Sequence, residues 1–279
     1  MIVAIIGTGL IGGSMALALR QNGFASGIIG VESNELHAAQ AVQLGLVDRV
    51  EPLEAAVSMA ALIVLAVPVN IAEQLLPQIL DATEKQVIMD VGSIKLPLLQ
   101  RVEGHPKRGR YVATHPMWGT EYSGPEAAVK GAFNGKATVI CDGERSDKDA
   151  VQLVETLYGV LGMHLVYMGA EEHDVHVAYI SHISHITSFA LANTVLEKEK
   201  EEEAIFELAS GGFESTVRLA KSNPAMWVPI FKENRENVLD VLNEHISQLR
   251  KFKACLEKEN YEYLQELIED ANKIKRIIK

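Results

Sequence analysis

The sequence has few cysteines, no excess of basic residues and no long apolar run. Two cysteines, Cys141 and Cys255, occur among 279 residues, which is too few for a disulfide framework and lacks the spacing of a metal site. Lysine and arginine number 26 against 37 aspartates and glutamates, which gives a net charge of −11. Because nucleic acid and anionic membranes bind through basic surfaces, the sequence predicts neither as a partner.

The N-terminus has the pattern of neither a signal peptide nor a membrane span. The apolar run Ile2–Ile6 has no basic residue before it and is much shorter than the roughly 20 apolar residues of a spanning helix. Together with the low cysteine count, this predicts a cytoplasmic protein. Hydrophobic residues make up 48% of the chain and charged residues 23%, as in ordinary globular proteins, and the length has room for two domains.

Residues 1–169 alternate short β-branched runs with helical patterns. Several of the runs are continuously apolar, which is typical of parallel strands covered on both faces. The alternation predicts an N-terminal α/β domain with a Rossmann-type, doubly wound sheet. The predicted strands are Ile2–Ile6, Gly27–Val31, Leu62–Val67, Gln86–Val91, Tyr111–Thr114, Ala137–Cys141 and His164–Tyr167, and the helices between them include Leu10–Gln21, Asn34–Gln43, Asn70–Leu80 and Asp147–Leu161.

Residues 170–279 show helical periodicity alone, which predicts an all-α C-terminal domain. One stripe of mainly apolar residues has the spacing of a single helix face, and it can form either a dimer seam or a contact within one subunit. The stripe consists of Val238, Val241, Leu242, His245, Leu249 and Phe252. The predicted helices are Glu171–Leu196, Glu201–Ala209, Phe213–Ser222, Trp227–Lys258 and Tyr261–Ile278.

The segment Gly7–Gly12 has the pattern G-x-G-x-x-G, directly after an apolar strand and at the start of a helix. This context is typical of a dinucleotide-binding loop. Gly7 would permit a tight turn, Gly9 would let the backbone approach a pyrophosphate, and Gly12 would let the helix pack against the strand. The helix N-terminus would then direct N–H groups and a partial positive charge at the diphosphate.

Glu32 follows the second predicted strand. A carboxylate at this place can bind the ribose hydroxyls of NAD and would repel the 2′-phosphate of NADP, although it could also be a plain surface acid. Ser33 and Asn34 come next and supply no arginine for that phosphate, so the predicted cofactor is NAD. The predicted cofactor-binding residues are Gly7, Thr8, Gly9, Leu10, Ile11, Gly12, Glu32, Val67 and Pro68.

Three further segments hold polar residues at places suited to chemistry. Asp90–Lys95 ends the fourth predicted strand, where ligands bind in this architecture, and its Ser93 could also cap the next helix. His115 ends the fifth strand, and a neutral imidazole there could take a proton from an alcohol, although a lone histidine is more often structural. Ser181–His185 lies in the first helix of the second domain.

Four histidines on that helix raise the question of a metal site. His173 and His176 precede His182 and His185, and at about 100° per residue the two pairs would face opposite sides of a regular helix. The sequence therefore predicts no metal site formed by this helix alone.

Five motifs, in the family order, make the chain resemble the prephenate and arogenate dehydrogenases of tyrosine biosynthesis. They are GTGLIGGS (7–14), DVGSIK (90–95), HPMWGTEYSG (115–124), SHISH (181–185) and GGFESTVRLAKSNPAMW (211–227). The resemblance implies oxidation of a ring hydroxyl by hydride transfer to NAD, with loss of the ring carboxylate as CO₂. Prephenate would give 4-hydroxyphenylpyruvate, and arogenate, the alternative substrate, would give tyrosine directly.

The resemblance also implies roles for single residues. His115 would assist deprotonation of the substrate hydroxyl, Ser93 would hold that hydroxyl near the nicotinamide, and Arg218 would bind a substrate carboxylate. At Ser184 many relatives carry proline, which affects the helix bend and the direction of His185. Helical domains of such enzymes commonly pair, so a homodimer is expected. The other implied substrate-binding residues are Ser181, His182, His185, Thr120, Glu121, Gly211 and Trp227.

Two other functions, a β-hydroxyacid dehydrogenase and a nicotinamide-binding sensor, explain fewer of these residues. A β-hydroxyacid dehydrogenase would share the two-domain plan but relies on a lysine in the first helix of its second domain. No lysine or arginine occurs between Asp149 and Glu197. A nicotinamide-binding sensor without turnover would not need a set like His115, Ser93 and Arg218.

Overall fold

An eight-stranded sheet forms the N-terminal part of the protein. The computed structural model describes residues 1–200 and 206–277, and the strand order is β3-β2-β1-β4-β5-β6-β7-β8. All neighbouring strands are parallel except β6 and β7. The strands are β1 (Ile2–Ile6), β2 (Gly27–Val31), β3 (Arg49–Val50), β4 (Leu62–Leu65), β5 (Val87–Asp90), β6 (Tyr111–Pro116), β7 (Ala137–Cys141) and β8 (His164–Met168).

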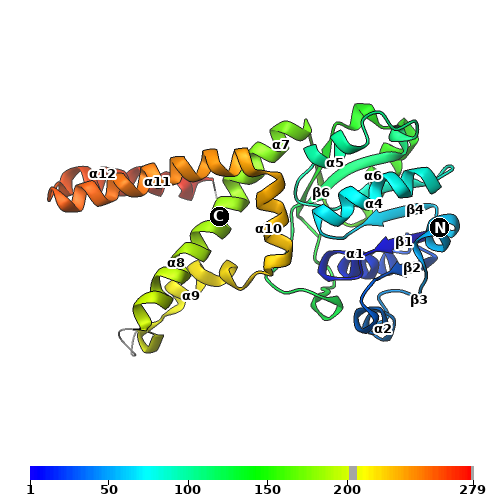
Figure 1. Ribbon diagram of the computed structural model, residues 1–279, viewed down its shortest axis with the longest axis horizontal. Coiled ribbons are helices and arrows are strands. Elements are labelled where there is room, and N and C mark those ends of the chain that lie inside the picture. Colours follow the sequence, from blue (N-terminus) through cyan, green and yellow to red (C-terminus); the bar gives the residue numbers. More distant parts are fainter. Residues whose placement is uncertain (201–205, 278–279) are drawn as a thin grey trace.

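Helices cover both faces of this sheet, so the predicted doubly wound α/β fold is confirmed (Figure 1). Along β1, Val3 and Ile5 join the core beneath one layer of helices, and Ala4 and Ile6 join the core on the other face. This alternation follows from the two-residue period of a strand. The first layer contains α1 (Leu10–Gln21) and α6 (Lys148–Val160), and the second contains α3 (Leu53–Met59), α4 (Val69–Ala82) and α5 (Leu96–Arg101), while α2 (Glu35–Gln43) lies beside β2 and β3.

Two strands end earlier than the sequence predicts, while β6 ends later, at Pro116 rather than Thr114, and β8 ends at Met168 rather than Tyr167. β4 ends at Leu65 rather than Val67, and β5 ends at Asp90 rather than Val91. The two-residue strand β3, Arg49–Val50, was not predicted at all. Apolar residues continue past the last paired residue because the loops at the carboxyl edge of the sheet are themselves partly buried.

Helices alone follow β8. The predicted first helix is observed as α7 (Ala170–Val177), a π-helical turn at Ala178–His182 and α8 (Ile183–Glu199). The predicted helix Trp227–Lys258 divides at Asn234 into α10 (Pro224–Glu233) and α11 (Arg235–Glu257). The remaining helices are α9 (Gly211–Val217), which a 3₁₀ turn at Arg218–Lys221 extends, and α12 (Tyr261–Asn272). Of the predicted helix Glu201–Ala209, residues 201–205 lie outside the described residues, and Phe206–Leu208 form a 3₁₀ turn.

Helix α10 lies between the sheet domain and the long helices, while α11 and α12 extend away from the sheet (Figure 1). A small apolar cluster joins α10 to the sheet domain. In it Trp227 and Ile230 of α10 pack with Val69 of α4 and Ile94 of the loop after β5. This cluster places α10 over the carboxyl edge of the sheet, where ligands bind in doubly wound folds.

Membrane-spanning helices are absent from the described part of the chain, since none of its helices combines the necessary length and apolar character.

Two glycine substitutions test this packing. A Cβ at Gly12 would lie 2.0 Å from the backbone oxygen of Gly7, so Gly12→Ala should lower the free energy of unfolding by about 3 kcal/mol, near the upper end of overpacking costs. The exposed Gly159 of α6 has open space at its Cβ position, so Gly159→Ala should raise stability by about 0.5–1 kcal/mol. Denaturant titration measures both. Equal stability of the two variants would contradict the packing of α1.

Candidate active site

The glycine loop connects β1 to α1 and leaves room beside one of its glycines. Gly7 has φ +91°, and a Cβ there would lie 2.4 Å from the carbonyl oxygen of Ala66. Gly7 and Gly12 are therefore required by the chain's own packing. A Cβ at Gly9 would find only the backbone nitrogen of Gly124 within 4 Å, at 3.9 Å. The space at Gly9 suits close approach by a diphosphate at the N-terminus of α1.

Glu32 lies at the end of β2, directly beside this loop. Its carboxylate accepts hydrogen bonds from the backbone N–H of Thr8 at 3.2 Å and from the Thr8 hydroxyl at 3.0 Å. The N–H of Asn34 donates to the other carboxylate oxygen at 3.1 Å. Glu32 is thus held in place as an acceptor where a ribose would lie, rather than projecting freely into solvent.

The loop that follows β6 passes over the glycine loop. Its Val129 N–H donates to the Ser14 hydroxyl of α1 at 2.9 Å, and its Glu126 accepts from Gln40 of α2 at 3.0 Å. Gly124 of this loop lies next to Gly9. The loop carrying Thr120 and Glu121 therefore borders the predicted cofactor site as well as the predicted substrate site, a relation that spacing in the sequence does not reveal.

His115 lies at the end of β6 and begins a chain of hydrogen bonds to α7. Its Nδ1 is 2.9 Å from Nε2 of His173, and Nδ1 of His173 is 2.8 Å from a carboxylate oxygen of Asp174. Asp174 also accepts the backbone N–H groups of Lys95 and Leu96, at 2.8 and 2.9 Å. The chain of contacts thus joins β6, α7 and the loop after β5.

The order of these contacts fixes the positions of the protons. A carboxylate only accepts, so His173 donates from Nδ1, and its Nε2 accepts from Nδ1 of His115. The lone pair of His115 is consequently on Nε2. Burial, followed by the neighbouring His173, Lys95 and His182, holds the pKa of His115 well below its usual range. His115 is therefore neutral at pH 7, with a basic nitrogen available.

His173 and Asp174 were not predicted as part of this site. The sequence interpretation considered His173 only as a metal ligand and placed it opposite His182 on a regular helix. In the structure His182 instead belongs to the same set of contacts, because Asn234 binds both the backbone oxygen of Asp174 and Nδ1 of His182. The π-helical turn Ala178–His182 has more residues per turn than an α-helix and changes the relative direction of the side chains on either side of it. In the sequence, the sign of this role was that His173 and Asp174 are neighbours.

The helical wall of the site is a stack of aromatic rings. His185 lies on Trp227 with ring centroids 3.5 Å apart, and His182 meets Trp227 edge-on at 5.9 Å. Desolvation lowers the pKa of His182 to about 4 and also lowers that of His185. Both rings are therefore neutral at pH 7.

Asn234, the residue at which the predicted helix divides, anchors this wall. Its Nδ2 donates to the backbone oxygen of Asp174 at 2.7 Å and lies 3.2 Å from Nδ1 of His182, while its Oδ1 accepts from Asn237 at 2.8 Å. Nδ1 of His182 is therefore an acceptor, and the proton is on Nε2. Within the described residues, neither this Nε2 nor Nε1 of Trp227 has a hydrogen-bond partner, although both are buried.

Arg218 and Glu121 form an ion pair with a 2.7 Å contact. The Arg218 side chain is 49% exposed and that of Glu121 is 11% exposed. A bond to its own backbone N–H lowers the pKa of Glu121, and Arg218 lowers it further. Arg218 also contributes to the lowered pKa of His185.

The remaining predicted residues are less closely connected. Ser93 is half-buried in the loop after β5, and the Thr120 hydroxyl accepts from the N–H of Tyr122 at 3.3 Å. The carbonyl of Ser181 lies 3.1 Å from Nδ1 of His185. Gly211 is exposed at the start of α9, and a Cβ there would meet no atom of the described residues within 4 Å. Val67 and Pro68 lead from β4 into α4.

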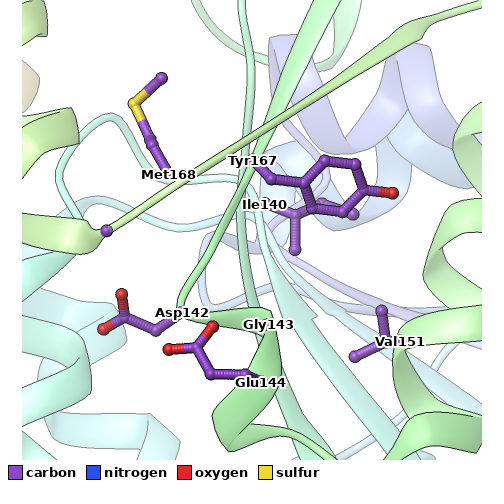
Figure 2. A pocket seen from close by; sticks show the side chains of 8 residues that line it. Ile140, Asp142, Gly143, Glu144, Val151, Tyr167 and Met168 are labelled. Atoms are coloured by element: carbon purple, nitrogen blue, oxygen red, sulfur yellow. The ribbon is translucent and has the colours of Figure 1, made fainter.

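A separate cavity of about 390 Å³ lies near the ends of β7 and β8, and Figure 2 shows its lining. It is bordered by Asp142, Glu144 and Tyr167, among others, and no predicted site residue lines it. Among the described residues, no three His, Cys, Asp or Glu side chains gather as a metal site would require.

The burial of His182 predicts a pH dependence of stability. The unfolded chain binds a proton at this residue below about pH 6.5 and the folded chain only below about 4, so His182 should remove about 3 kcal/mol of stability as the pH falls through this window. His182→Gln should reduce the loss by that amount, and His164→Gln, at an exposed position, should not. Denaturant titrations at pH 7 and pH 4 measure the difference. Equal losses in the two variants would contradict the assignment.

Comparison with known proteins agrees with this geometry. Residues 15–167 match the nucleotide-binding domain of prephenate dehydrogenase, and residues 169–270 match its dimerization domain. Prephenate dehydrogenase of Bacillus subtilis is 33% identical over 94% of this chain and 72% of its own length. Cyclohexadienyl dehydrogenase of Zymomonas mobilis is 29% identical over 99% of this chain and 96% of its own.

Among solved structures, prephenate dehydrogenase from Aquifex aeolicus, crystallised with hydroxyphenyl propionate and NAD⁺, superposes with a TM-score of 0.90. It is 32% identical, and the match covers 99% of this chain and 97% of that one. The agreement of sequence and fold over nearly the whole chain shows that the protein belongs to the prephenate dehydrogenase family, as its motifs predicted.

Proposed function

We propose that the protein is an NAD-dependent prephenate dehydrogenase, which oxidises and decarboxylates prephenate to 4-hydroxyphenylpyruvate in tyrosine biosynthesis. The observation that carries the proposal is the hydrogen-bonded chain His115–His173–Asp174 at the carboxyl edge of a doubly wound sheet. It presents a neutral base at the edge of the sheet where the glycine loop also lies. Relatives named prephenate or cyclohexadienyl dehydrogenase support the same reaction class.

The residues present fit NAD. Gly9 offers the open approach for the diphosphate, and Glu32 offers ribose acceptors on a carboxylate that Thr8 and Asn34 hold in place. Val67 and Pro68, between β4 and α4, would border the nicotinamide half. When bound, NAD supplies the hydride acceptor. The Aquifex aeolicus relative was crystallised with NAD⁺, which supports this choice of cofactor.

His115 would act as the general base. Its Nε2 lone pair would take the proton of the ring hydroxyl while the hydride leaves the ring carbon that carries this hydroxyl. The positive charge that then develops on the imidazole is adjacent to His173 and, through it, to the carboxylate of Asp174. Ser93, in the loop after β5, would hold the substrate oxygen opposite His115.

Arg218 would bind a substrate carboxylate. A guanidinium has five N–H donors, and the contact with Glu121 uses Nη1, so further N–H groups of this half-exposed side chain can bind a substrate. Since the protein carries a net charge of −11, binding of a dianion requires a cation directed at the site.

The buried N–H groups of the aromatic wall favour prephenate over arogenate. Nε2–H of His182 and Nε1–H of Trp227 lack acceptors among the described residues. The keto acid side chain of prephenate has acceptors only, whereas the side chain of arogenate carries an ammonium group in place of the keto oxygen. If the stack of His182, His185 and Trp227 opened to receive the keto acid side chain, the oxygens of that side chain could accept hydrogen bonds from these two N–H groups. This would be favourable because a buried donor without a partner costs free energy.

The helical part, residues 170–279, would serve as the substrate-binding and dimerisation domain of a cytoplasmic homodimer. Within the subunit, Val238 and Val241 of the predicted stripe are buried, and His245 contacts Thr187 of α8 at 3.2 Å. Leu249, farther along α11, is 55% exposed. The first half of the stripe therefore packs inside the subunit, and the exposed Leu249 in its second half would contact the partner.

A direct assay tests the activity. NADH formation should be observed with prephenate and NAD, with a higher kcat/KM than for arogenate, and NADP should replace NAD poorly because Glu32 repels its 2′-phosphate. A 3-hydroxy acid should give no signal. A preference for arogenate would make that alternative the function, and a preference for NADP would exclude the assigned role of Glu32.

Two substitutions separate the roles of base and anion binder. His115→Asn should lower kcat by about 10²–10⁴-fold with little change in KM, because a general base acts in the transition state. Arg218→Ala, in the same site but away from the transferred proton, should mainly raise KM for prephenate. Steady-state kinetics of both variants measure the contrast. Near-normal turnover of His115→Asn would show that another group takes the proton.

A homodimer is expected from the exposed apolar faces of the C-terminal helices. In α8 Ser188 alone is buried, and in α12 no residue is, which is unusual for long helices of a single subunit. Sedimentation should give twice the chain mass of 30.5 kDa. Leu249→Glu should shift the equilibrium to monomer, whereas Leu36→Glu, at an exposed leucine of α2, should not. A monomeric parent protein would contradict this arrangement.

A further inference from the structure

An ion pair with no solvent contact lies beneath the candidate site. The Lys95 ammonium binds the carboxylate of Asp90, and both side chains are 0% exposed. Neither group can touch a substrate or a cofactor. A buried ion pair is weak evidence for stability, because removing two charges from water costs about as much as their attraction returns. The contacts of this pair indicate a role other than stabilisation, because the pair binds backbone groups of two segments of the site.

On one side the pair holds the end of β6. Lys95 Nζ donates to the backbone oxygen of Thr114 at 2.7 Å, and the Asp90 carboxylate accepts the N–H of Thr114 at 3.2 Å. The Tyr111 hydroxyl donates to the same carboxylate at 2.8 Å. Both backbone groups of Thr114, the residue directly before His115, are thus bound by one ion pair.

On the other side the pair holds the loop that carries Ser93. The N–H of Gly92 donates to Asp90 at 2.8 Å, so the loop is tied down directly before Ser93. Two residues after Ser93, the backbone N–H of Lys95 donates to Asp174 at 2.8 Å. Asp174 in turn orients His173. Lys95 therefore contacts all three segments that present Ser93, His115 and His173.

We propose that the buried Asp90–Lys95 pair is a positioning device for the reaction, which fixes the end of β6 and the loop after β5 so that His115 and Ser93 converge on the same substrate oxygen. The proposal rests on the proposed function in one respect, the assignment of His115 as base. Displacements of about 1 Å in such groups can cost 10²-fold in rate, so a rigid connection between the two segments has catalytic value.

The charge of Lys95 has a second consequence. It contributes to the lowered pKa of His115, together with burial, His173 and His182. Two carboxylates lie near this histidine chain, that of Asp90, which is bound to Lys95, and that of Asp174, behind His173. Loss of the ammonium should therefore make His115 easier to protonate, an effect that a purely structural role would not produce.

The test uses Lys95→Met and the double variant Asp90→Asn/Lys95→Met. The single variant leaves a buried carboxylate unpaired and can fail to fold, whereas the double variant removes both charges and is expected to fold, with an unfolding midpoint close to that of the parent. Arg20→Met, which breaks the exposed pair of Arg20 with Asp48, is the control.

Two measurements on the double variant decide the matter. In steady-state assays with prephenate and NAD, kcat should fall by about 10–100-fold with less than about a threefold change in KM, because positioning acts on the reacting atoms. In the ligand-free protein, the ¹³C-labelled imidazole of His115 should begin to protonate at a higher pH than in the parent, as observed by NMR, because Lys95, and not Asp90, is among the groups that lower its pKa. Arg20→Met should match the parent in both.

A folded double variant with parental kcat and parental titration of His115 would overturn the proposal and make the pair a packing element. If the parent itself oxidises neither prephenate nor arogenate, the proposed function fails, while the NMR titration still reports whether Lys95 acts on His115. The two failures are therefore distinguishable.

Discussion

The hydrogen-bonded chain from His115 through His173 to Asp174 is the contact on which the site depends, because it crosses from the sheet to the helices. The sheet supplies the imidazole at the end of β6, and α7 supplies the groups that orient it. Asp174 connects further, to the loop after β5 through two backbone N–H groups and to Asn234 through its own carbonyl. One residue, through its carboxylate and its backbone carbonyl, therefore sets the relative positions of the base, the Ser93 loop and the aromatic wall.

Neutrality is the second common property of the site. Desolvation lowers the pKa of His115, His182 and His185 alike, so the histidines act as hydrogen-bonding groups and as a proton acceptor rather than as cations. The Lys95 ammonium is buried and bound to Asp90, whereas Arg218 is half-exposed and paired with Glu121, so its charge is accessible to a substrate. In an acidic protein this separation provides one cation for an anionic substrate and a dry, neutral region for the proton transfer.

Much of the fold could be predicted from the sequence because local patterns specify it. Apolar runs ended by turns predict the strands. The glycine loop after β1 was predicted from the need for a tight turn and close helix packing, and the structure shows that a Cβ at Gly7 or Gly12 would clash with the backbone. The errors occurred where tertiary contacts override periodicity. The helix predicted to run through Asn234 divides there because that amide binds Asp174 and His182, and a π-helical turn interrupts the first helix of the second part. No pattern of neighbouring residues specifies either feature.

By itself the sequence determined the family, the doubly wound sheet, the dinucleotide loop and the residue types of the chemistry, since these depend on local spacing and on motifs. Only the tertiary structure decided which of these residues meet. It joined His173 and Asp174 to His115, paired Arg218 with Glu121 across 97 residues, and placed the Asp90–Lys95 pair beneath the site. The physical reason is that burial and hydrogen bonding between distant segments depend on how helices and strands pack, and packing directions are not encoded in the spacing along any one segment.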